Sequence, residues 1–122
     1  MADQIIEPKN IGLGKENKIW LEKLQADKFF KEMKDGYIFS ISYALSKGID
    51  PPEIQDKDGS MYSISTIDPD REIYSAISCL MPLYNGPIYK MAEKLADYGC
   101  SELVKLYKEN KLDIAVIVEQ SQ

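Results

Sequence analysis

The densest group of potentially reactive side chains lies between residues 50 and 72, where seven Asp or Glu residues stand against two basic ones. Paired carboxylates can bind a divalent cation or exchange protons with a substrate. Asp56 and Asp58 are spaced like the first ligands of a calcium loop, but Met61 and Ile67 replace the glycine and glutamate that the loop requires. A solvated acidic turn is therefore the better interpretation.

Other catalytic chemistry finds little support in the residue types. The chain contains no histidine, which excludes Ser-His and Cys-His pairs, histidine bases and histidine metal ligands. Gly12-Leu13-Gly14-Lys15 lacks the spacing of a phosphate loop. Cys79 and Cys100 are too few for a four-ligand zinc site, and we expect both to be small buried hydrophobes. We predict no enzyme, no catalytic residue, no cofactor and no metal; a hydrolase using Asp56, Asp58, Asp68 and Asp70 is the alternative.

Lysines crowd the first helical region, with Trp20 and two phenylalanines between them. A basic and aromatic surface can hold a nucleic-acid backbone and stack bases. Carboxylates are interspersed with these lysines, however, and such mixing is typical of a solvated helix face. A nucleic-acid-binding module is therefore the alternative function, and its candidate residues are Lys15, Lys18, Lys23, Lys28, Lys31 and Lys34.

Charge and aromatic content favour a protein partner over DNA. The chain has 15 Lys or Arg against 20 Asp or Glu, for a net charge of −5, whereas nucleic-acid binders usually carry a basic surplus. Eight tyrosines are many for 122 residues, and tyrosine is enriched at protein interfaces. We predict a protein partner or a homo-oligomer, with DNA not favoured. The candidate contact residues are Trp20, Tyr37, Tyr84, Tyr89 and Tyr98.

The chain's length and apolar spacing predict one helical domain over residues 15–122, preceded by an irregular segment at 1–14. The longest apolar run, residues 114–118, is far too short to cross a membrane. With two cysteines and no secretory h-region near Met1, we expect a reduced, cytoplasmic protein.

The N-terminal half of this domain is predicted to contain a central helix. Residues 15–33 have helical spacing, either as one helix or as two, with Asp27 capping the second. Residues 35–47 are apolar nearly all round, which is typical of a buried helix. Asp35 is the expected N-cap, Gly48 the left-handed C-cap, and Ile49 the apolar contact that follows it.

The C-terminal half is predicted to contain three more helices. Asp68-Pro69 indicates a helix start, with Leu80 in its buried stripe. A second helix is expected over 87–98, ended by Gly99, and a third from Ser101 to about Asn110. Residues 61–67 alternate like a short strand. The segment 112–118, rich in Ile and Val, is either a strand that pairs with residues 61–66 or a last buried helical turn. The predicted fold is mainly α, a compact bundle of about five helices with or without a small two-stranded β-hairpin.

Three stretches together resemble a known family. Residues 30–39, FKEMKDGYIF, resemble the opening F-x-x-M-K-D-x-F-x-F pattern of small accessory proteins associated with bacterial DNA phosphorothioation (Dnd) systems. Residues 73–77 are similar to that family's middle helix, and residues 92–103 to its E-x-Y-A-N-G-G-L region in a shifted form. The resemblance covers about residues 25–110.

The resemblance implies an accessory protein of a DNA-modification or phage-defence cluster, and it implies no catalytic residues. Combined with the residue chemistry, it predicts a non-enzymatic accessory or adaptor protein that binds another protein. The acidic segment 50–72 is a second feature that could meet a basic partner.

Overall fold

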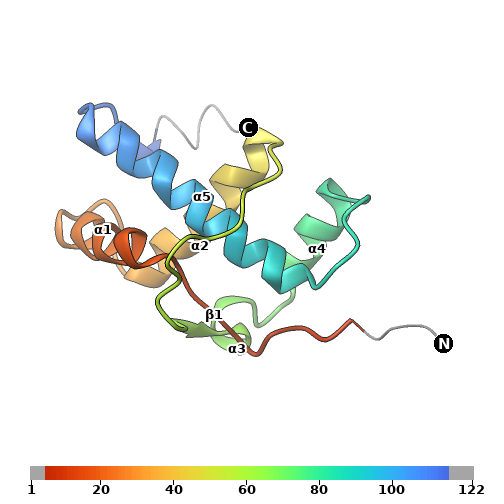
Figure 1. The fold of residues 1–122 in the computed structure, drawn as a ribbon. Coiled ribbons are helices and arrows are strands. Elements are labelled where there is room, and N and C mark those ends of the chain that lie inside the picture. The colour runs from red at the N-terminus through yellow and green to blue at the C-terminus, as the bar shows by residue number, and fades with distance from the viewer. Residues whose placement is uncertain (1–4, 116–122) are drawn as a thin grey trace.

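The computed structural model of the chain describes residues 5–115. Over this range the fold is mainly α, with five helices and one two-stranded antiparallel sheet, as predicted (Figure 1). The elements in chain order are β1 (Asn10–Ile11), α1 (Lys15–Ala26), α2 (Met33–Lys47), β2 (Tyr62–Ser63), α3 (Ile64–Ile67), α4 (Glu72–Leu80) and α5 (Ile88–Lys108).

Helix α5 organises the domain, since it contacts α1, α2, α4 and β1. The predicted end of this helix at Gly99 is wrong, because α5 continues without a break to Lys108. Gly99 is required for packing between helices. A Cβ at this position would lie 2.7 Å from the carbonyl carbon of Ser40 and still closer to the carbonyl oxygen. The glycine therefore lets α5 and α2 approach backbone to backbone.

Helix α2 is the predicted central helix, but it begins earlier than expected. Glu32, and not Asp35, is its N-cap, and the two form a capping box in which the Asp35 carboxylate accepts from the Glu32 amide at 3.1 Å. The C-terminal prediction is confirmed, because Gly48 closes the helix at φ 65°. Ile49, the predicted apolar contact after this cap, is 41% exposed.

The segment between α1 and α2 contains no second helix. The predicted break at Ala26-Asp27 is confirmed, but Asp27 is the C-cap of α1 and does not begin another helix. Lys28 then adopts a left-handed φ of 67°, which turns the chain. The turn buries Phe30, whose ring lies 5.6 Å from that of Phe39 on α2.

The small sheet pairs the N-terminal segment with the acidic one. Asn10 lies opposite Ser63, and Ile11 lies opposite Tyr62. A pairing of the strand at 61–66 with the C-terminal segment is therefore not formed by the described residues 112–115. Residues 116–118 lie outside the described range. The strand predicted over 61–67 stops after Ser63 because this side chain accepts from the Thr66 amide and caps α3. In the described part of the segment predicted to be irregular, residues 5–14, the strand β1 is the regular element, and Ile11 and Leu13 are fully buried.

Asp68 begins α4 in an unexpected way. Pro69 is not the first helical residue, because Arg71 at φ 57° is the N-cap and α4 starts at Glu72. The Asp68 carboxylate nevertheless satisfies the helix N-terminus, since it accepts from the amides of Ile73 at 2.9 Å and Tyr74 at 3.0 Å. Asp68 therefore caps α4 as predicted, although a turn at residues 69–71 separates it from the first residue of the helix.

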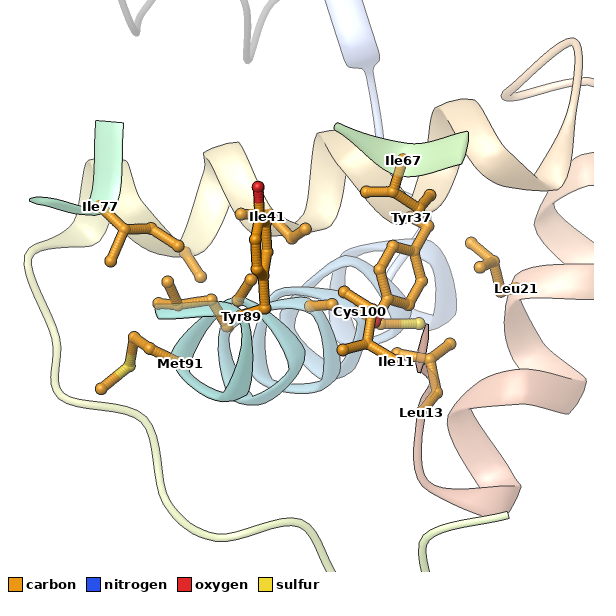
Figure 2. Packing of buried hydrophobic residues seen from close by; sticks show 14 of the residues in the cluster. Ile11, Leu13, Leu21, Tyr37, Ile41, Ile67, Ile77, Tyr89, Met91 and Cys100 are labelled. Atoms are coloured by element: carbon orange, nitrogen blue, oxygen red, sulfur yellow. The ribbon is translucent and has the colours of Figure 1, made fainter. Parts of the chain in front are cut away.

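The main core lies between α2 and α5 (Figure 2). Tyr37 and Ile41 project from α2 toward α5, and the N-terminal segment closes one end of the cluster. A second, smaller cluster of Leu24, Phe30 and Leu103 joins α1, the turn after it and α5. None of the helices described in residues 5–115 is long and apolar enough to cross a membrane.

Two carboxylates of α5 hold the N-terminal segment in place. Glu93, which is 3% exposed, accepts from the Gly12 amide at 2.9 Å, and Asp97 accepts from the Gly14 amide at 2.8 Å. The Tyr37 hydroxyl donates to the Gly12 carbonyl at 2.8 Å. These side chains form hydrogen bonds with backbone groups of Gly12 and Gly14 on the edge of the segment that does not pair with β2. Buried backbone groups generally require such partners.

Candidate protein-binding surface

Three large apolar side chains are exposed around the ends of α2 and α4. Leu83 is 96% exposed, Leu80 64% and Ile49 41%. We refer to Ile49, Leu80 and Leu83 as the apolar patch. Isolated exposed hydrophobic residues are normal on a soluble protein, whereas a contiguous group points to an interaction site.

The local structure explains why these side chains face outward. Ile77 is fully buried on the inner side of α4, whereas Leu80 is the last residue of this helix, lies at the edge of the domain and is 64% exposed. Its predicted place in the buried stripe of this helix is therefore wrong. Pro82 follows the Met81 cap and forbids another helical turn, which leaves Leu83 in an open loop.

A groove of about 520 Å³ runs through the apolar patch. Leu45 from α2 and Met91 from α5 contribute to it, the latter almost fully buried. This size lies within the range of pockets that take apolar ligand groups. The groove is lined by Leu45, Gly48, Ile49, Asp50, Leu80, Met81, Pro82, Leu83, Tyr84, Asn85 and Met91.

The charge near the groove is mainly negative. Asp50 is the only charged residue in its lining. Burial raises the pKa of the Tyr84 hydroxyl, and Glu7, Glu53 and Asp50 raise it further, whereas Lys94 opposes them. Tyr84, which lines the groove, therefore senses more negative than positive charge.

The aromatic residues predicted to contact a partner do not form one surface. Tyr84 alone among them lines the groove. Tyr37 is fully buried and Tyr89 is 5% exposed with its hydroxyl donating to Asp68, so neither presents a surface to a partner. Tyr98 is half-buried against the main core. Sequence reasoning missed the apolar patch, although Leu83 among Pro, Asn and Gly residues was a usable signal.

Trp20 lies in a separate aromatic and basic cluster. Its ring meets the edge of Tyr107 at 5.9 Å. The ammonium groups of Lys23 and Lys108 lie 5.1 Å and 4.8 Å from the ring centroid. The Tyr107 hydroxyl donates to Asp27 in turn, which ties the end of α5 to the end of α1.

The predicted lysine group is distributed over α1, the following turn and the start of α2. Lys18 is half-buried and pairs with Asp58 at 3.6 Å, and Lys23 is directed at Trp20. Lys34 is also half-buried, and the remaining members, Lys15, Lys28 and Lys31, are exposed. Lys18 and Lys23 of the predicted lysine group thus contact other side chains of the same chain.

The residues considered for metal or thiol chemistry are dispersed. In residues 5–115 no group of three or more Cys, Asp or Glu side chains is arranged to hold a metal ion. Asp68 is buried and engaged in capping α4. Cys79 is exposed, contrary to prediction, whereas Cys100 is buried as predicted, and burial raises its thiol pKa to about 12. Such a thiol is neutral and unreactive at neutral pH.

Comparison with family models, with curated protein sequences and with solved structures finds no match for this chain.

Proposed function

We propose that this protein is a non-enzymatic adaptor that binds another protein through the apolar patch. The observation that supports the proposal is the exposure of Leu80 and Leu83 beside a groove with an apolar floor. Burying one such leucine on binding is worth about 1.5–3 kcal/mol. Two leucines and Ile49 together contribute about 5–9 kcal/mol, which leaves a weak contact, roughly millimolar, once the cost of association is subtracted and before the partner's own buried surface is counted.

The partner that fits is a segment with large apolar side chains and a basic flank. Leu45 from α2, Leu80 from α4 and Met91 from α5 all line the groove, so it can receive several apolar side chains from one face of an amphipathic helix. Asp50 supplies negative charge in the lining of the groove, and the whole chain carries −5. Charge of the opposite sign on the partner would favour encounter and orientation.

A designed helical peptide of leucine and lysine tests this proposal, with a leucine and glutamate peptide of the same pattern as its counterpart. Amide shifts of the protein are followed by NMR during titration. We expect the basic peptide to shift the amides of Leu80, Leu83 and Asn85, and the acidic peptide to bind at least about tenfold more weakly.

Two variants of equal charge separate the apolar patch from general attraction. Leu83→Glu and Ile19→Glu each replace an exposed apolar residue by a carboxylate, and Ile19 lies on α1, outside the groove. Leu83→Glu should weaken the basic peptide roughly tenfold or more, while Ile19→Glu should not. Equal binding by both variants, absence of shifts at the patch, or a dimer of the free protein that Leu83→Glu dissolves would each overturn the proposal.

The biological setting that we propose follows from the resemblance of residues 25–110 to Dnd-associated proteins. It is a cytoplasmic role in prokaryotic DNA-modification-linked phage defence, in which the adaptor contacts a protein component. Failure of the chain to associate with any protein component of such a system, under conditions in which the peptide binds, would refute this setting while leaving the binding surface intact.

Nucleic-acid binding is the second candidate, favoured by the position of Lys23 and Lys108 beside Trp20. Chromatography with light scattering, with and without a short DNA duplex, distinguishes the two. DNA binding that weakens steeply as salt rises and is lost in a Lys23→Ala, Lys108→Ala double variant would promote this candidate. Elution unchanged by DNA at low salt would exclude it.

A further inference from the structure

A second cavity, of about 740 Å³, lies where the N-terminal segment meets the starts of α4 and α5. Its lining includes Lys9, Arg71 and Tyr74, and it shares only Tyr84 and Asn85 with the groove of the apolar patch. The volume lies within the range typical of small-molecule sites. No function described above uses this cavity.

The carboxylates of this region are already engaged. Glu7, which lines the cavity, accepts from the Ile88 amide at 2.9 Å and the Tyr89 amide at 2.8 Å, and so caps α5. The neighbouring Asp68 accepts from two α4 amides and from the Tyr89 hydroxyl at 2.8 Å. The Glu7 and Asp68 carboxylates are thus bound at the N-termini of α5 and α4, where the helix dipoles stabilise their negative charge.

The cations of the cavity, Arg71 and Lys9, in contrast, form no ion pair with a carboxylate within residues 5–115. Arg71 is the only arginine of the chain. Its guanidinium carbon lies 4.1 Å from the centroid of the Tyr74 ring. Stacking fixes the plane of the guanidinium and leaves its N–H edges free for a bidentate contact with an anion.

The remaining walls supply polar and apolar surface in about equal measure. Asn10, Ser65 and Asn85 offer amide and hydroxyl groups, while Ile64 and Ile88 offer apolar surface. An inorganic anion would fill only a small part of the volume. A ligand that uses both the cations and these walls must carry an anionic group on an organic body.

We propose that this cavity binds a small organic phosphate, of the size of a nucleoside monophosphate, with its phosphate on Arg71 and Lys9. Guanidinium and ammonium groups suit a dianionic phosphate, and the tyrosine-bearing wall suits the organic part. The site is independent of the adaptor function, because its anchoring residues lie outside the apolar patch.

Adenosine monophosphate is the probe, and inorganic phosphate and adenosine are its separate halves. Amide shifts in the full chain are followed by NMR up to millimolar ligand. We expect the monophosphate to shift the amides of Ser65, Tyr74 and Asn85, and each half alone to bind at least about tenfold more weakly. Adenosine or inorganic phosphate binding as tightly as the monophosphate would overturn the proposal, as would the absence of shifts at these amides.

Arg71→Gly is the decisive variant, because glycine adopts a φ of 57° without strain and the fold is retained. This variant should bind adenosine monophosphate roughly tenfold or more weakly than the parent protein. Arg71→Lys keeps the charge without the planar guanidinium, so its affinity should lie between those of the parent protein and Arg71→Gly. Lys31→Ala removes an exposed cation outside the cavity and is the matched control. Binding that Arg71→Gly and Lys31→Ala reduce equally would show general charge attraction and refute the site.

Discussion

Replacing Gly99 by alanine tests the backbone contact between α2 and α5. The added Cβ would lie 2.7 Å from the carbonyl carbon and 3.0 Å from the Cα of Ser40, whereas ordinary contacts begin at 3.4 Å. Both atoms belong to the backbone of a buried helix, so no change of rotamer relieves the clash. The two helices would have to separate by roughly 1 Å along their shared core.

The cost can be worked out from opposing terms. Overpacking against rigid atoms costs about 3 kcal/mol at the upper end of its usual range. Alanine recovers up to about 1 kcal/mol, since glycine is the poorer helix former. The net loss of about 2 kcal/mol corresponds to a Tm lower by roughly 6–12 °C for a domain of this size.

Urea and thermal unfolding followed by circular dichroism measure this loss. Gly36→Ala is the matched comparison, because its Cβ would meet only side chains, 2.7 Å from Leu21 Cδ1 and 2.9 Å from Phe30 Cδ2. These side chains can adjust, so Gly36→Ala should cost about 1 kcal/mol or less. If Gly99→Ala were as stable as the parent protein, or more so, Gly99 would be merely a weak helix residue and the reasoning would be refuted.

Glu93→Ala should lower the free energy of unfolding by about 2–4 kcal/mol in urea. The change removes the acceptor of the Gly12 amide and the partner of the Lys57 ammonium, which lies 2.8 Å from the Glu93 carboxylate. A loss below about 0.5 kcal/mol would contradict this prediction. A thiol reagent should label Cys79 of the native protein rapidly and Cys100 only after unfolding, and equal labelling rates would be the contrary result. Because burial raises the Cys100 pKa to about 12, the unfolded thiol ionises first as pH rises. Stability due to the neutral thiol is therefore complete below about pH 8.5 and is lost toward pH 12, by up to about 1.4 kcal/mol per pH unit. Cys100→Ala should show a correspondingly shallower alkaline loss.

Local signals predicted the elements whose ends are set locally. The all-round apolar run after Asp35 identified α2, and Gly48 marked its end because a left-handed C-cap depends only on adjacent residues. Gly99 carries the same local signal, yet it lies inside α5. The difference is the carbonyl of Ser40, 59 positions earlier in the chain, which no local rule includes.

Strand pairing and surface exposure were harder to predict for a related reason. The alternation after Met61 indicated a strand, but within residues 5–115 its partner is β1, because register is decided across the whole fold. Leu80 fits the apolar spacing of α4, and only the position of that helix at the edge of the domain leaves it exposed. The apolar patch was therefore not predictable from spacing, although Leu83 in a turn gave a hint.

The attachment of Gly12 and Gly14 to Glu93 and Asp97 also constrains the order of folding. Residues 81 and 83 positions apart meet in these bonds, so the N-terminal segment has no partner on that edge until α5 has been synthesised. Contacts of such long range slow folding, because a large loop must close first. On the ribosome, the segment around Gly12 and Gly14 must therefore wait until α5 has emerged before that edge acquires its native hydrogen bonds.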